Sequence, residues 1–144
     1  MPASVKTVLA ANTRYGWPFQ GRVEYTAQIT LDISDFSSTW VDSDGFVKPG
    51  TPVRENGSPI SAASQYVYGV IAEPVRIGYD GTSYGNTDAI LDAATDIQVA
   101  VVTHGQVVKG IVEDNIGRAL NDNEVKAFAA SGSHLLLLDY ALNT

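Results

Sequence analysis

The sequence predicts a mainly β (α+β) fold, a small β-barrel or β-tulip-like domain with one C-terminal helix and an extended N-terminal arm. Three observations predict it. Apolar and polar residues alternate strictly over residues 23–33, as in a half-buried strand. Residues 34–66 are crowded with turn residues. One capped helix is expected over residues 122–131. The arm is placed at residues 1–22 and the β-rich domain at residues 23–144.

Composition excludes several classes of protein. The chain has 144 residues, of which 44% are hydrophobic and 17% are charged, which suits one compact domain. Its formal net charge of −7 disfavours binding to a phosphate backbone, so we expect no nucleic-acid partner. The chain has no cysteine, which excludes disulfides and thiolate metal sites. No apolar run approaches the roughly 20 residues of a membrane helix, so we expect neither a membrane partner nor a signal peptide.

The arm carries apolar groups that need a partner surface. Gly16 and Pro18 interrupt any regular structure there, and an aromatic cluster surrounds them. Trp17 has a second interpretation, in which it packs on its own domain. The residues expected to contact a partner are Val5, Val8, Leu9, Tyr15, Trp17 and Phe19.

The domain is expected to contain several strands after the alternating segment. Further strands are predicted at residues 46–47, 51–53, 66–72 and 97–103. His104-Gly105 is interpreted as a turn that leads to a strand at residues 106–108, which makes a hairpin. Residues 76–96 form a long polar excursion, expected to be an exposed loop.

The helix prediction rests on local capping signals. Asn121 or Asp122 can accept hydrogen bonds from the free first-turn N–H groups, and Glu124 has the capping-box spacing from Asn121. Val125, Phe128 and Ala129 form one apolar stripe, and Gly132 is expected to end the helix. The run of four leucines at residues 135–138 predicts a closing buried strand.

Chemistry-bearing motifs are sparse, and we expect no catalytic residue, no metal site and no cofactor. His104 and His134 are interpreted as a solvated turn residue and a cation at a helix C-terminus. A calcium loop starting at Asp42 would need a glutamate at its twelfth position, which is Val53, so a turn is expected instead. The Glu113-Asp114 pair is expected in a solvated loop after a strand.

Tyrosine is concentrated at residues 66, 68, 79 and 84. Tyr79 and Tyr84 form a possible exposed binding loop for another protein or a sugar, because tyrosine buries a large area and keeps a polar tip. The alternative is that Tyr66 or Tyr68 belongs to the core and the loop tyrosines are incidental.

From residue 46 onward the chain carries four short motifs in order: Phe46-Val47-Lys48-Pro49-Gly50-Thr51-Pro52-Val53, then Tyr68-Gly69-Val70-Ile71-Ala72-Glu73, then Ile97 to Val108, and last the segment 122–133 with the apolar end. Their order resembles that in lambda-type phage head decoration proteins. The four motifs are similar to the opening strand and Pro-Gly turn, the next strand, the following hairpin, and the C-terminal helix and last strand of those proteins. The long 78–96 excursion and the distinct first 40 residues depart from the lambda protein.

The resemblance implies a structural, non-enzymatic virion protein. Such proteins bind the outer surface of the major capsid protein as homotrimers at three-fold and quasi-three-fold sites, and they reinforce the expanded head. The N-terminal segment would reach across the capsid, and the protein would pass through the host cytoplasm during assembly. Two alternatives stay open: a carbohydrate- or receptor-binding module of a virion or cell surface that uses Tyr79 and Tyr84, and a small hydrolase that uses Glu113 or Asp114.

Overall fold

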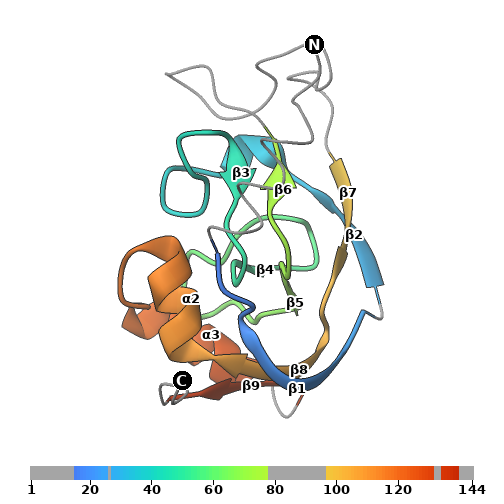
Figure 1. The fold of residues 1–144 in the computed structure, drawn as a ribbon. Coiled ribbons are helices and arrows are strands. Elements are labelled where there is room, and N and C mark those ends of the chain that lie inside the picture. The colour runs from blue at the N-terminus through green and yellow to red at the C-terminus, as the bar shows by residue number, and fades with distance from the viewer. Residues whose placement is uncertain (1–14, 26, 78–96, 132–133, 140–144) are drawn as a thin grey trace.

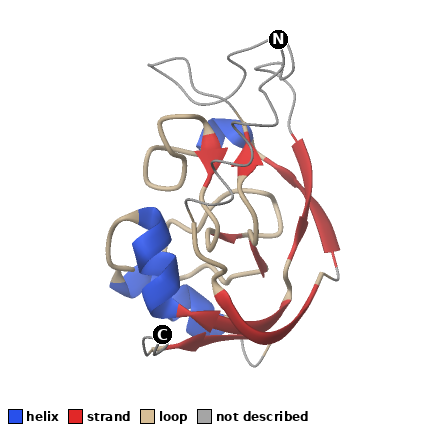
Figure 2. Cartoon of the chain, in the orientation of Figure 1, coloured by secondary structure: helices blue, strands red, loops and turns tan. Residues whose placement is uncertain are grey.

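A computed structural model describes residues 15–25, 27–77, 97–131 and 134–139. The chain is mainly β with two α-helices, as the sequence predicts for its class (Figures 1 and 2). The strands are β1 (Phe19–Glu24), β2 (Ala27–Leu31), β3 (Phe46–Val47), β4 (Pro52–Val53), β5 (Gly69–Val70), β6 (Val75–Arg76), β7 (Ile97–Val101), β8 (His104–Val108) and β9 (Leu135–Leu138). The helices are the 3₁₀ turn η1 (Ile33–Asp35), α2 (Lys109–Ile116) and α3 (Asp122–Ala130). Within these described residues the strands form four separate sheets, so they close no barrel.

A long bent ribbon organises the molecule. β1 pairs with β8, and β2 pairs with β7, both antiparallel. Glu24 lies opposite His104 and Ala27 opposite Val101, so one register continues across the bend between the two strand pairs. Figure 1 shows this ribbon along the base and one side of the molecule, with α2 and α3 on the other side. The short strands lie between them.

The predicted hairpin at His104-Gly105 is wrong, because β7 and β8 pair with two different strands and not with each other. His104 and Gly105 lie inside β8. A Cβ atom at Gly105 would lie 3.0 Å from Cγ1 of Val23. The glycine therefore reflects the close approach of two strands and not a turn.

The alternating segment forms two strands instead of one. β1 ends at Glu24 and β2 begins at Ala27, so the alternation crosses the bend. Ile29, Leu31 and Ile33 are buried as predicted. Tyr25, predicted on the buried face, is 48% exposed, because it lies at the bend.

The middle of the chain forms the two short strand pairs β3–β6 and β4–β5. β3 and β4 confirm the predicted strands on either side of Pro49-Gly50. The predicted strand at residues 66–72 is confirmed only as the two-residue β5, although Val67 and residues 69–72 are buried. The Asn56-Gly57 turn is present, with Gly57 at φ +91°.

The C-terminal half contains one helix more than predicted. α2 follows β8 directly, and its N-cap residue Val108 supplies no side-chain hydrogen bond, so the sequence carries no capping signal for it. α3 confirms the predicted helix and its capping box between Asn121 and Glu124. The two helices carry the chain back to β9, which pairs parallel to β8. Leu135 is buried, whereas Leu136 in this edge strand is 45% exposed.

The core lies between the ribbon, the helices and the short strands. Its largest fully buried side chains come from every part of the fold and include Phe46, Phe128, Leu31, Ile33 and Ile71. Phe19 belongs to the same core. No helix in the described part of the chain is long and apolar enough to cross a membrane.

Candidate functional site

The segment in front of β1 is fastened to the domain by α2. The Asn115 side chain accepts a hydrogen bond from Gly16 N and donates one to Gly16 O, each 2.8 Å long. Asn115 Nδ2 also donates to Pro49 O, 3.1 Å away. The Tyr15 hydroxyl donates to Asp42 Oδ2 over 2.6 Å. Residues 15 and 16 therefore have fixed positions against two separate parts of the domain.

The predicted arm boundary at residue 22 falls inside β1. Pro18 O accepts a hydrogen bond from Val108 N, so the strand pairing extends to that residue. Phe19, predicted to contact a partner, is only 3% exposed. Phe19 is therefore a core residue and cannot serve as an exposed anchor. The aromatic pattern of the sequence alone does not distinguish a core aromatic from a surface one.

Trp17 remains at the surface. Its side chain is 46% exposed, and its ring meets that of Phe19 edge to face with centroids 5.3 Å apart. The contact with Phe19 supports one side of the indole, and the other side is open to solvent. The remaining predicted arm residues, Val5, Val8 and Leu9, and the loop tyrosines Tyr79 and Tyr84, lie outside the described residues.

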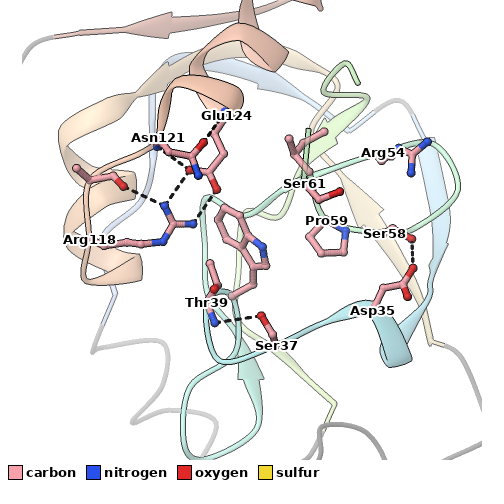
Figure 3. Close-up of a pocket in the computed structure, with 13 residues that line it drawn as sticks. Asp35, Ser37, Thr39, Arg54, Ser58, Pro59, Ser61, Arg118, Asn121 and Glu124 are labelled. Atoms are coloured by element: carbon pink, nitrogen blue, oxygen red, sulfur yellow. Dashed lines mark hydrogen bonds and ion pairs between the residues drawn. The ribbon is translucent and has the colours of Figure 1, made fainter. Parts of the chain in front are cut away.

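A polar hollow of about 720 Å³ lies where the turn between α2 and α3 meets the loop between η1 and β3 and the loop that follows β4 (Figure 3). Its volume is within the range of ligand pockets. Hydroxyl, carboxyl, amide and guanidinium groups contribute most of its lining. The lining residues are Asp35, Ser37, Thr39, Trp40, Arg54, Ser58, Pro59, Ile60, Ser61, Arg118, Ala119, Asn121 and Glu124.

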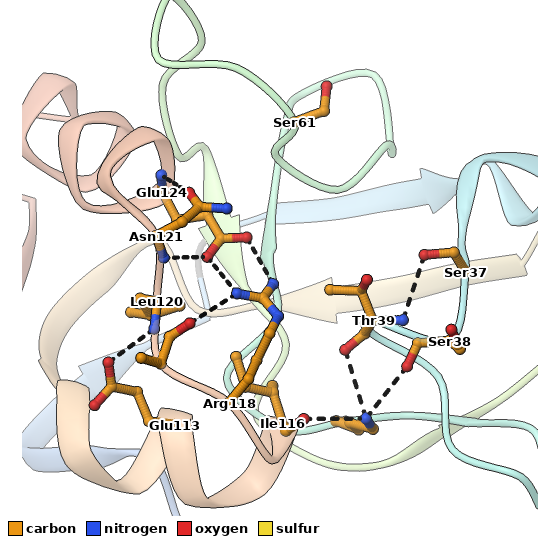
Figure 4. A network of polar contacts seen from close by, with 12 residues as sticks. Ser37, Ser38, Thr39, Ser61, Glu113, Ile116, Arg118, Leu120, Asn121 and Glu124 are labelled. Atoms are coloured by element: carbon orange, nitrogen blue, oxygen red, sulfur yellow. Dashed lines mark hydrogen bonds and ion pairs between the residues drawn. The ribbon is translucent and has the colours of Figure 1, made fainter.

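Arg118 forms part of one wall of this hollow, and both of its terminal nitrogens donate hydrogen bonds there. Its two terminal nitrogens donate to Glu124 Oε1 and Oε2 over 2.9 and 2.7 Å, and one also reaches Ala119 O (Figure 4). The guanidinium carbon lies 4.9 Å from the centroid of the Trp40 ring. The hydrogen bonds to Glu124 raise the pKa of Arg118 above its ordinary value. Arg118 is therefore a structural cation that compensates the buried Glu124.

Lys48 ties the end of α2 to the loop before β3. Its Nζ lies 3.3 Å from Ile116 O, 3.4 Å from Ser38 O and 3.5 Å from Thr39 O. A cation suits the carbonyl end of a helix because of the helix dipole. Burial lowers the pKa of Lys48, while nearby Asp42 acts in the opposite direction.

Arg54 differs from these two cations. Among the described residues its guanidinium has no hydrogen-bond or ion-pair partner. It lines the polar hollow and also a second one of about 510 Å³. Asp35, across the first hollow, accepts a 2.6 Å hydrogen bond from the Ser58 hydroxyl at Oδ2. Arg54 is therefore a cation that a ligand can reach.

The two histidines lie together, which sequence spacing could not reveal. The ring centroids of His104 and His134 are 4.6 Å apart in an edge-to-face arrangement, and His104 Nδ1 lies 3.9 Å from Glu24 Oε2. The expectation that His104 is a turn residue is wrong, since it begins β8. In the described part of the chain no three His, Asp or Glu side chains are placed to hold a metal ion.

The two acidic motifs have structural surroundings. Asp42 Oδ1 accepts hydrogen bonds from the backbone N–H groups of Asp44 and Phe46, each 3.0 Å long, which confirms the predicted turn. Glu113 and Asp114 lie in α2, so the prediction that they lie in a solvated loop after a strand is wrong. Glu113 Oε2 accepts a hydrogen bond from Leu120 N, so this carboxylate stabilises the turn between the helices.

Comparison of the chain with models of known protein families, with curated proteins and with solved structures finds no match. The sequence predicts Trp17 as a contact residue and Asn121 and Glu124 as a capping box. It gave no signal for Asn115, Arg118 or Arg54, whose roles depend on residues far away in the chain.

Proposed function

We propose that this chain is a structural virion protein that binds the outer surface of the major capsid protein of a phage head and reinforces the expanded shell. It would act as a homotrimer at three-fold and quasi-three-fold sites, without enzymatic activity or a cofactor. Three of the four motifs from residue 46 onward support the proposal: strand, Pro-Gly turn and strand correspond to β3 and β4, the next strand to β5, and the C-terminal helix and last strand to α3 and β9. The fourth, the hairpin predicted at residues 97–108, does not support it, because β7 and β8 do not pair with each other.

The observation that carries the proposal is the exposed indole of Trp17 on a fixed base. Aromatic side chains that are immobilised before binding lose little conformational entropy on association, and they dominate interface energies. Asn115 fixes the backbone of Gly16, and Phe19 supports the Trp17 ring. Residues 1–14 directly precede this segment in the sequence, and we propose that they contact the same partner surface as Trp17.

Capsid binding by truncated and substituted chains tests the proposal. Deletion of residues 1–14 is the informative truncation, because removal of residues 1–20 would also remove the buried Phe19 and cost about 3–5 kcal/mol of stability. We expect the wild-type chain to co-sediment with expanded capsids of the phage that encodes it and not with unexpanded ones. Deletion of residues 1–14 and Trp17→Ala should each weaken retention about tenfold or more.

Tyr25→Ala is the matched control, because Tyr25 is a second aromatic of nearly equal exposure at 48% at the bend of the ribbon. It should leave capsid retention unchanged. Retention of the Trp17→Ala chain at the wild-type level, with its thermal unfolding unchanged, would remove Trp17 as an anchor. Failure of the wild-type chain to bind expanded capsids would overturn the proposed function itself.

A further inference from the structure

Strand pairing stops abruptly along one edge of β7. Val70 and Val102 exchange two backbone hydrogen bonds, 2.9 and 3.0 Å long, in an isolated bridge. Antiparallel pairing beyond this bridge would place Ala72 opposite Ala100, but in the described part of the chain no hydrogen bond joins these two residues. Pro74, which follows, has no N–H group to donate. The sheet of β2 and β7 therefore ends at this edge of β7.

The open edge of β7 carries backbone groups that another strand can use. In an antiparallel ladder the N–H and C=O groups of every second residue point to the same edge of the strand. Because those of Val102 point toward Val70, those of Ala100 and Gln98 point to the same side, away from β2. Open strand edges of this kind bind extended peptides by main-chain hydrogen bonds.

A hollow of about 490 Å³ lies beside this edge, and its volume is within the range of ligand pockets. Most of its lining is apolar: Ile71, Ala72, Pro74, Val75, Val99 and Ala100. Tyr25 and Glu73 complete the described lining, which contains one carboxylate and no lysine, arginine or histidine. The charge of the hollow is therefore negative.

The carboxylate of Glu73 is available to a ligand. Among the described residues it has no hydrogen-bond or ion-pair partner. Arg76, the nearest basic residue in the sequence, has its guanidinium carbon 5.6 Å from the centroid of the Phe46 ring and does not line the hollow. Burial raises the pKa of Tyr25, and the negative charge of Glu73 raises it further, so these two side chains lie near each other. Tyr25 is 48% exposed, and a cation beside Glu73 can also contact its ring.

We propose that the open edge of β7 binds an extended peptide of a partner protein, which adds a strand to β7 and places a basic side chain between Glu73 and Tyr25. The backbone groups of Gln98 and Ala100 bind the peptide main chain, and the apolar walls cover its neighbouring side chains. A free organic cation would use only Glu73 and Tyr25, so the open edge favours a peptide. This inference goes beyond the proposed capsid role and does not depend on it, because Trp17 does not line the hollow.

Calorimetric titration with three capped probes tests the inference. The first is a heptapeptide of alternating threonine and valine with a central arginine, and the second carries glutamate in place of the arginine. The third is N-acetylarginine methylamide, which offers the same cation without a strand. We expect the arginine peptide to bind at least about tenfold more tightly than either other probe, the scale of one charge-assisted hydrogen bond.

Each probe can also contradict the inference. Equal binding of the glutamate peptide would show that the negative charge of the hollow does not select the ligand. Equal binding of N-acetylarginine methylamide would show that the site takes a free cation and not a strand. Absence of binding by the arginine peptide at about 1 mM would overturn the inference as a whole.

Two pairs of variants locate the binding. Glu73→Gln should weaken binding of the arginine peptide about tenfold, while Glu55→Gln, which removes an exposed carboxylate outside the hollow, should not. Tyr25→Ala should weaken binding, while Tyr66→Ala, at a tyrosine of nearly equal exposure outside the hollow, should not. A Glu73→Gln chain with wild-type affinity would overturn the inference. Capsid retention of the Glu73→Gln chain should stay at the wild-type level, so failure here does not affect the proposed function.

A third variant tests the added strand. Ala100→Pro removes an N–H group from the open edge and leaves the pairing with β2 in place, because a proline is tolerated where the N–H faces away from the sheet. It should weaken binding of the arginine peptide about fivefold, the scale of one neutral hydrogen bond, with thermal unfolding close to that of wild type. A folded Ala100→Pro chain with wild-type affinity would exclude strand addition at β7. If this chain does not fold, the comparison with N-acetylarginine methylamide decides the same point.

Discussion

The side chain of Asn115 and the backbone of Gly16, 99 residues apart in the sequence, form a reciprocal pair of 2.8 Å hydrogen bonds. The same amide reaches Pro49 O, so one buried side chain joins the N-terminal segment, α2 and the turn before β4. An amide group can do this because it carries both a donor and an acceptor. The position of Trp17 therefore depends on a residue on α2.

Replacement of Asn115 should remove the hydrogen bonds that connect the N-terminal segment, α2 and the turn before β4. Asn115→Ala leaves Pro49 O and both polar groups of Gly16 without their partner, and an unsatisfied buried group costs about 1–3 kcal/mol. We expect the free energy of unfolding, measured by urea titration, to fall by that amount. Asn123→Ala, at an exposed position on α3, is the matched control. A loss of unfolding free energy below about 0.5 kcal/mol, typical of surface substitutions, would show that the hydrogen bonds of Asn115 to Gly16 and Pro49 do not stabilise the fold.

Two glycines with similar backbone angles should respond differently to alanine. Gly57 and Gly117 have φ values of +91° and +77°, and an alanine in this region costs about 1–2 kcal/mol. A Cβ at Gly57 would lie 1.9 Å from Thr30 O, whereas one at Gly117 meets nothing within 4 Å. Gly57→Ala should therefore be less stable than Gly117→Ala by at least about 1 kcal/mol in thermal or urea unfolding. Equal losses would mean that the loop carrying Gly57 shifts away from β2 without cost.

Stability at alkaline pH should show two opposed contributions. The native pKa of Lys48 is lowered from 10.5, chiefly by burial, so between the native pKa and 10.5 the unfolded chain binds more protons and stability rises with pH. The native pKa of Tyr25 is raised from 10.0, chiefly by burial and further by Glu73, so above 10.0 the native chain holds more protons and stability falls. Relative to wild type, Lys48→Gln should become progressively less stable as pH rises through its window, and Tyr25→Phe progressively more stable above 10.0. Urea titrations at a series of pH values measure both slopes, and a slope of the opposite sign in either variant contradicts the assignment.

Local signals in the sequence predicted the elements that local interactions determine. The capping box of α3 involves residues three apart, and both of its hydrogen bonds are present. The turn at Asp42 and the burial of Ile29 and Leu31 also follow from near neighbours. α2 was missed because it starts without a side-chain cap and contains Gly110 in its first turn.

The features that sequence could not predict depend on distant partners. β7 and β8 pair with β2 and β1 and not with each other, and these partners lie far away in the sequence. The sequence therefore predicts a turn at Gly105, which lies inside a strand. The burial of Phe19 depends on the same pairing. In the candidate site, Arg118 compensates Glu124 across the turn between two helices, a spacing that matches no helical or strand repeat.

The ribbon has a consequence for how the chain is synthesised. Phe19 pairs with Val107, and Leu31 pairs with Ile97, so β1 and β2 have no sheet partner until those later residues leave the ribosome. Loops of this length must close before the pairing stabilises anything, and such topologies fold slowly. Early strands that wait with open edges are prone to aggregate. Yield of the native chain should therefore depend on chaperones or slow translation more than the small size of the domain suggests.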